Sequence, residues 1–253
     1  TVQAAAGIVL SSSVSTGTTS TSTSSPTVMS AGTGTLTVAA TKSLSSTGQL
    51  LTVTGNDVDL AGTSISSGTS VLVIDCTTTG HTIGLGGTAK DMHVSSVELA
   101  KVTAGGMEVG SATSGDMTVN GLTAASSNSI AGTVTLVATQ ALKKVVFAGA
   151  SSTFNTLAVQ ARNGVILSAS LYTDTGSLYL DGDSDDTAEA TAATDGRVVI
   201  TGKTISSATV LTLEAGSASV TGQGTMTLLA ANGIVLDDSV TTAGALVMSA
   251  GSG

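Results

Sequence analysis

Short apolar strands separated by glycine-containing corners recur along the whole chain. In residues 35–38, 133–136 and 225–228, aliphatic residues or methionine alternate with threonine. A period of two places one set of side chains in a core and the other set outside. Steps such as Thr201-Gly202 and Asp195-Gly196 supply the tolerance of positive φ that tight corners need. The pattern predicts an all-β chain with almost no helix.

A five-residue phrase returns in changed surroundings. It reads AGIVL at residues 6–10, NGVIL at 163–167 and NGIVL at 232–236. Each copy is followed by a polar step and a later apolar strand, at residues 27–32, 177–182 and 245–251 respectively. Imperfect copies of one small unit predict stacked repeats that acquire a core only from their neighbours.

We therefore expect one continuous parallel β-solenoid over residues 1–253. The chain is 41% hydrophobic but only 2% aromatic and has no Trp, which favours a thin core filled by aliphatic side chains. A mean hydropathy of +0.42 argues against disorder. With about 20–25 residues per rung and about 4.8 Å per rung, the rod has roughly 10–12 rungs and a length of roughly 50–60 Å. A β-sandwich or barrel is the structural rival, because hairpins use the same corners.

The combined pattern resembles a known family. Asn/Ala-Gly-Ile/Val-x-Leu, followed by a polar step and Leu-x-Met/Leu-x-Ala-Gly, is similar to the shaft repeats of filamentous-haemagglutinin-type exoproteins and β-helical adhesins. The resemblance implies a right-handed parallel β-helix that is secreted, displayed at a cell surface and not catalytic. The secretion domain of that family carries an Asn-Pro-Asn-Gly turn, and this chain has only the Asn-Gly halves, as at Asn163-Gly164. The resemblance therefore concerns the shaft repeats only.

The ends of the sequence show no clear capping segment. Natural solenoids cover their terminal strand edges with polar caps, whereas this chain begins and stops within the repeat pattern. We expect head-to-tail assembly of identical chains into a filament, since a heterologous contact does not close. The alternative is that the sequence is a piece of a longer exoprotein. The expected assembly residues are Ile8, Val9, Leu10, Leu246, Val247 and Met248.

Net charge and hydropathy limit the classes of binding partner that the sequence predicts. With 8 basic and 17 acidic residues the formal net charge is −9, so nucleic acid is an unfavourable partner. No run of about 20 apolar residues predicts a membrane span. The expected location is extracellular, with partners among identical chains, surface glycans or cell-surface proteins. The single Cys76 ends an apolar strand and is interpreted as a small buried hydrophobe.

An acidic loop insertion is expected at residues 181–196. Asp181, Asp183 and Asp185 alternate as in a calcium loop. Asp186 then occupies the position of the turn glycine, and Ala192 stands where a closing Glu belongs. Two interpretations stay open, a solvated loop and weak calcium binding.

Residues 11–27 form a Ser/Thr-rich stretch that contains Pro26, the only proline of the chain. Such a composition is typical of O-glycosylated segments or of a flexible loop. The candidate acceptors are Ser22, Thr23, Ser24, Ser25 and Thr27.

Two features of the sequence bear on functions other than a structural role. Thr-x-Thr pairs resemble the arrays of ice-binding β-solenoids, which would make the chain a monomeric binding module for ice or glycan. The pairs are Thr35/Thr37, Thr52/Thr54, Thr133/Thr135 and Thr225/Thr227, without even spacing. An enzyme is disfavoured, because His81 and His93 lack a nucleophile or metal-ligand pattern and the chain has two Tyr and two Phe as sugar platforms. No residue is assigned a catalytic role.

Overall fold

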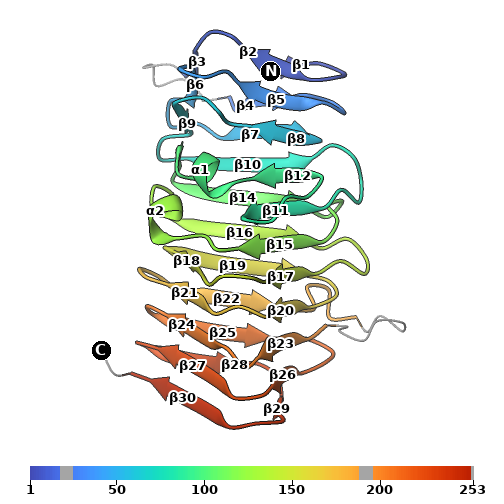
Figure 1. Cartoon of the computed structure of the whole chain (residues 1–253), viewed down its shortest axis with the longest axis vertical. Coiled ribbons are helices and arrows are strands. Elements are labelled where there is room, and N and C mark those ends of the chain that lie inside the picture. The colour runs from blue at the N-terminus through green and yellow to red at the C-terminus, as the bar shows by residue number, and fades with distance from the viewer. Residues whose placement is uncertain (18–24, 188–195, 252–253) are drawn as a thin grey trace.

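The computed structural model describes residues 1–17, 25–187 and 196–251. The chain is all-β, with 52% strand and 3% helix, and its long parallel sheets are consistent with a β-solenoid. Figure 1 shows the strands stacked along one long axis, with the first strands at one end and the last strands at the other. The expected fold class is confirmed at this level.

The largest sheet contains ten strands and runs the length of the molecule. Its strands, in spatial order, are β1 (Val2–Gln3), β4 (Thr27–Ser30), β7 (Leu51–Gly55), β10 (Val71–Cys76), β14 (Gly106–Ser111), β16 (Thr133–Ala138), β19 (Thr156–Ala161), β22 (Leu178–Asp181), β25 (Val210–Glu214) and β28 (Gly233–Leu236).

A second side is divided between a three-stranded and an eight-stranded sheet. The smaller contains β2 (Ile8–Leu10), β5 (Thr35–Val38) and β8 (Asp57–Asp59). The larger contains, in spatial order, β12 (Met92–Val94), β11 (Ile83–Gly86), β15 (Met117–Asn120), β17 (Val145–Phe147), β20 (Val165–Leu167), β23 (Val198–Thr201), β26 (Val220–Gln223) and β29 (Val240–Thr242).

The third side is divided in the same way. Four strands form one sheet, β13 (Val102–Thr103), β9 (Ser64–Ser66), β6 (Ser43–Ser46) and β3 (Val14–Thr16). Five strands form the other, β18 (Ser152–Phe154), β21 (Leu171–Thr173), β24 (Thr204–Ser207), β27 (Met226–Ala230) and β30 (Leu246–Ala250). Two one-turn helices, α1 (Ser96–Leu99) and α2 (Ala124–Ser127), lie near the break between the sheets.

From β16 onward each strand pairs in parallel with the third strand that follows it. Thus β16 pairs with β19, β17 with β20 and β18 with β21. Register keeps like residues together: Leu136 lies opposite Val159, which lies opposite Leu180. All three are fully buried. The alternation seen in the sequence therefore becomes a continuous apolar ladder, the arrangement in which burial of each side chain is shared with its neighbours above and below.

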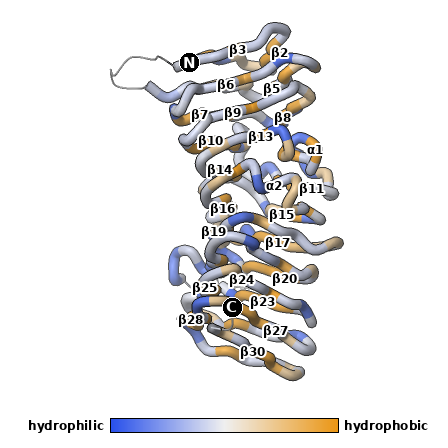
Figure 2. Tube along the Cα trace, turned by 90° about the vertical axis from the view of Figure 1, so that its left-hand side faces the viewer, coloured by the Kyte–Doolittle hydropathy of each residue, from blue (hydrophilic) through white to orange (hydrophobic). Residues whose placement is uncertain are grey.

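The sheet break near β8 is bridged by carboxylates rather than by strand pairing. Asp57 on β8 accepts the His93 N–H of β12 at 2.9 Å. Glu98 of α1 accepts the Leu60 N–H at 2.9 Å, and its other oxygen accepts both the N–H and the hydroxyl of Ser95, at 2.8 and 2.7 Å. Glu98 thus completes a capping box for α1 and also accepts a hydrogen bond from the backbone N–H of Leu60, the buried residue that follows β8. Figure 2 shows strongly hydrophilic positions near β8 and α1, in a chain drawn elsewhere mostly in pale colours with short hydrophobic stretches.

Two details of the sequence interpretation change. The recurring phrase forms a strand in every copy, but β2 and β20 lie on the second side while β28 belongs to the ten-stranded sheet. The phrase therefore indicates a strand that begins directly after a corner. Such strands occur on every side of the stack, so the phrase does not identify one fixed position in a repeat. Residues 11–27 are also not wholly loop, because Val14–Thr16 form β3 and Thr27 begins β4. The corners at Gly196 and Gly202 do have positive φ, 59° in each case.

Candidate functional site

The C-terminal triplet, defined as β28, β29 and β30, presents an apolar end surface. Each of the three strands is the last of its sheet in the described chain. Leu246 and Met248 lie opposite Met226 and Leu228, which are fully buried. Leu246 is nevertheless 36% exposed and Met248 50% exposed. These side chains occupy inward positions of the ladder on the last strand of their sheet, and no described residue packs on their far side.

The N-terminal triplet, β1, β2 and β3, is the corresponding surface at the opposite end. Val2 lies opposite the buried Met29, Ile8 opposite Leu36 and Val14 opposite Leu44, so all three point toward the core. Ile8 is 9% exposed, whereas Val2 is 44% exposed. Both ends thus carry inward-facing aliphatic side chains next to strand edges without a strand partner in the described residues.

The first and last strands of the ten-stranded sheet are joined by one ladder of inward residues. Parallel register connects Val2 on β1 to Met29 and, through the strands between them, Leu213 to Leu236 on β28.

The predicted assembly residues fall into two groups. Ile8, Leu10, Leu246 and Met248 occupy inward positions at the ends. Ile8 and Leu10 are already buried in the single chain, whereas Leu246 and Met248 would be buried only by a stacked neighbour. Val9 and Val247 point outward on the same strands and are 66% and 47% exposed. The structure places all six on end strands, β2 and β30.

The described part of the acidic loop is held by protein donors. Asp183 is 1% exposed and accepts the N–H and hydroxyl of Ser217 at 2.8 and 2.5 Å, and the N–H of Thr187 at 3.3 Å. Asp185 forms an ion pair with Arg162 at 2.9 Å. Asp186 takes φ 52°, the left-handed conformation for which a calcium loop uses glycine.

Asp181 is buried in register with another carboxylate. It lies opposite Glu214 on β25 and accepts the Asp183 N–H at 2.9 Å. Burial raises the pKa of Asp181 to about 7; the Asp183 N–H bond opposes this rise, and the charges of Glu214, Asp183 and Asp186 add to it. Glu214 in turn accepts the Tyr179 hydroxyl, and burial together with that bond raises the pKa of Tyr179.

These contacts do not assemble a calcium site from the three predicted aspartates. Asp183 is occupied by Ser217 and Thr187, Asp185 by Arg162, and Asp181 is buried beside the Asp183 N–H. Within residues 1–17, 25–187 and 196–251 no three His, Cys, Asp or Glu residues are grouped to hold a metal ion. The contacts instead fasten the loop to neighbouring turns of the stack, through Asp183 to Ser217 and through Asp185 to Arg162.

The predicted O-glycosylation residues are only partly placed. Ser22, Thr23 and Ser24 lie outside the described residues. Ser25 is exposed. Thr27 is 7% exposed and its hydroxyl hydrogen-bonds with that of Thr16, so this residue is a poor acceptor for a sugar.

The Thr-x-Thr pairs do not form one array. They are spread over β5, β7, β16 and the start of β27, which belong to three different sheets. The two pairs in the ten-stranded sheet are separated by β10 and β14, whose aligned outward residues include Val73 and Glu108. A flat threonine lattice is therefore absent from the described strands.

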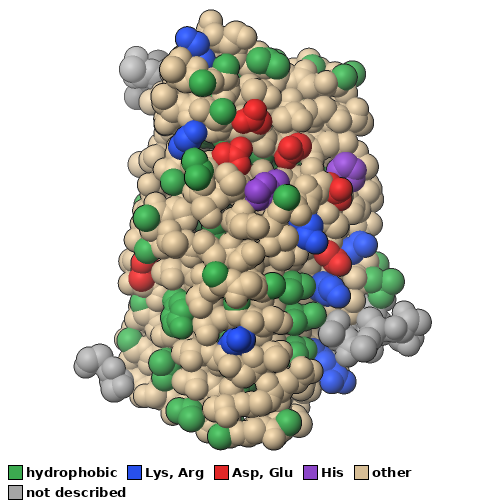
Figure 3. All heavy atoms as spheres, in the orientation of Figure 1, with side chains coloured by type: hydrophobic (Ala, Val, Ile, Leu, Met, Phe, Trp, Pro, Cys, Tyr) green, Lys and Arg blue, Asp and Glu red, His purple; other side chains and the backbone are tan. Residues whose placement is uncertain are grey.

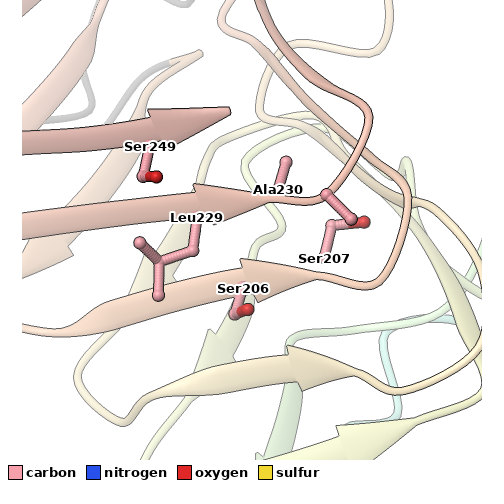
Figure 4. A pocket seen from close by; sticks show the side chains of 6 residues that line it. Ser206, Ser207, Leu229, Ala230 and Ser249 are labelled. Atoms are coloured by element: carbon pink, nitrogen blue, oxygen red, sulfur yellow. The ribbon is translucent and has the colours of Figure 1, made fainter. Parts of the chain in front are cut away.

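Cys76 and the surface hollow offer no reactive group. Cys76 is buried, its thiol lies 3.9 Å from the Met92 sulfur, and burial raises its pKa to about 12, so it stays a thiol. A hollow of about 270 Å³ lies over β24, β27 and β30 (Figure 4). Its lining is hydroxyl and aliphatic, without a titratable side chain: Ser206, Ser207, Leu229, Ala230, Ala231 and Ser249.

The front face in Figure 3 separates charge along the rod, with acidic side chains gathered toward the N-terminal strands and most Lys and Arg farther down. The described helices include none that is both long and apolar enough to cross a membrane.

No family model, curated protein or solved structure matches this chain. The resemblance to shaft repeats of exoproteins stays a prediction.

Proposed function

We propose that this chain is a structural shaft element of an extracellular filament or adhesin. In this proposal it is a right-handed β-helix with one turn for each strand of the ten-stranded sheet. The C-terminal triplet of one copy pairs in parallel with the N-terminal triplet of the next. The role is structural and not catalytic, and the chain is secreted and displayed at a cell surface.

The exposure of inward ladder residues at the C-terminal triplet carries the proposal. Met248 is 50% exposed, although its partner Leu228 is fully buried. Full burial of an exposed methionine is worth about 1.5–3 kcal/mol, so covering the exposed half of Met248 is worth about 1 kcal/mol. The proposed cover is a second copy, because a heterologous contact between opposite ends repeats without closing.

Two adjacent residues on β30 provide the test. Met248 faces inward and Val247 faces outward, with exposures of 50% and 47%. We expect Met248→Lys to abolish sedimentable assemblies, because a stacked neighbour would bury the charge, while Val247→Lys assembles as the parent does. Analytical ultracentrifugation of the three proteins measures this.

Two results would overturn the proposal: a parent chain that stays monomeric at all concentrations, or equal assembly of both variants. A monomeric parent would favour the alternative of a binding module for glycans or ice, or a segment whose ends are covered by further parts of a longer chain. Glycans and cell-surface proteins remain the proposed partners of the outer faces in either case.

A further inference from the structure

Three Asn-Gly steps in this chain have unequal surroundings. They are Asn120-Gly121, Asn163-Gly164 and Asn232-Gly233. An Asn followed by Gly can lose its side-chain amide when the backbone nitrogen of the glycine attacks the side-chain carbonyl carbon. The attack requires the Asn side chain to rotate freely, so its hydrogen bonds and packing decide which step reacts.

Asn120 is held on both sides of its amide. Its nitrogen donates to the Thr88 hydroxyl at 3.0 Å, and its oxygen accepts the Ala150 N–H at 3.0 Å. The backbone of Gly149 packs directly against this amide, since a Cβ at Gly149 would lie 2.4 Å from the Asn120 oxygen. The Gly121 N–H, the attacking group, donates to the Ala150 carbonyl at 3.2 Å.

Asn163 is held as well. It is 7% exposed, and its amide nitrogen donates to the Leu142 carbonyl at 3.1 Å. The Gly164 N–H donates to the Gly182 carbonyl at 2.9 Å. Reaction at either interior step must therefore break several hydrogen bonds in a packed corner.

Asn232 differs from both. It is exposed, and within the described residues its side chain makes no hydrogen bond; only its backbone N–H is engaged, with the Thr209 carbonyl at 2.9 Å. A Cβ at Gly233 would meet no atom within 4 Å, so the following backbone is also open on its side-chain face. Gly233 begins β28, the last strand of its sheet.

We propose that Asn232 is a site of spontaneous, structure-selected deamidation. The Gly233 nitrogen forms a bond to the Asn232 side-chain carbonyl carbon, the bond from that carbon to the amide nitrogen breaks, and ammonia leaves with the proton of the glycine nitrogen. Water then opens the resulting succinimide at either carbonyl and yields aspartate or isoaspartate. The net change is addition of water and loss of ammonia, with no oxidant or cofactor.

The products alter the last strand in two ways. Either product adds a negative charge beside β28. Isoaspartate also inserts an extra carbon into the main chain directly before Gly233. The extra carbon lengthens the corner before β28 and so strains the pairing that holds Ile234 and Leu236 opposite Leu211 and Leu213. Deamidation thus disrupts packing of the C-terminal triplet.

The experiment is a time course of the purified chain in mildly alkaline buffer, at a concentration at which it is monomeric. Peptide mass spectrometry with fragmentation that distinguishes isoaspartate follows all three steps in one molecule. We expect conversion at Asn232 to be faster by about tenfold or more than at Asn120 or Asn163, the factor that corresponds to one or two retained hydrogen bonds. In denaturant the three steps should convert at similar rates.

Asn232→Gln provides the matched variant, because its longer side chain forms the cyclic intermediate poorly. Hydrogen exchange at β28 should increase with time in the parent and stay constant in this variant. Equal folded-state rates at the three steps, faster conversion at Asn120 or Asn163, or an unequal order that persists in denaturant would each overturn the proposal.

Discussion

Single side chains in this chain are governed by their partners in the parallel stack. Alternation in the sequence was enough to predict that residues such as Val134 and Leu136 face inward, and the structure confirms this. It was not enough to predict that Asp181 lies opposite Glu214, because that pairing spans a loop whose length the pattern does not determine. The sequence suggested a metal loop at Asp183, and the structure shows a carboxylate saturated by Ser217 and Thr187.

Asp181 gives a prediction of pH dependence. Its folded pKa of about 7 lies above its ordinary value of 3.8, so between these values the folded chain retains a proton that the unfolded chain has lost. Stability should therefore fall as pH rises from about 4 to about 7. Asp181→Asn keeps an acceptor for the Asp183 N–H and removes this titration. Above pH 7 we expect the variant to be more stable by on the order of 3 kcal/mol.

Chemical denaturation across this pH range measures the effect. Asp237→Asn, a change at an exposed carboxylate after β28, serves as the control and should follow the parent curve. A constant difference between Asp181→Asn and the parent at every pH would refute a role for ionisation.

Whole elements were predictable where alternation is regular and missed where it is interrupted. The segment from β11 to β13 contains an additional strand, β12, and the helix α1. Sequence reasoning did not identify the helix that follows His93. A signal was present, since Ser95 and Glu98 have the spacing of a capping box. The similar box at Thr123 and Ser126 precedes α2.

Glu98 is the element-scale test. Glu98→Ala leaves the Leu60 and Ser95 N–H groups without their acceptor, so we expect a loss of about 2–3 kcal/mol of unfolding free energy and faster hydrogen exchange at Leu60. Glu98→Gln, which retains one acceptor oxygen, should lose less. Glu108→Ala, at an outward position of β14, should change little. Unchanged exchange at Leu60 in Glu98→Ala would show that the bridge across the sheet break contributes nothing.

The molecule is an elongated stack of strands. On each of its sides, apolar residues alternate with polar ones along the strands. That pattern predicts parallel strands and a thin core, and the only two Phe residues, Phe147 and Phe154, are both buried in its middle third. The positions of the sheet breaks depend on the lengths of the corners between strands, and so does the side on which each copy of the five-residue phrase lies. Corner lengths vary from one triplet of strands to the next, so the sequence shows no fixed period from which to predict them.

Negative-stain electron microscopy of the native protein tests the central proposal most directly. With a rise of about 4.8 Å per strand over ten strands, head-to-tail stacking predicts long fibres with a subunit repeat of roughly 50 Å. Discrete rods of about that length, without fibres at any concentration, would contradict assembly through the end triplets.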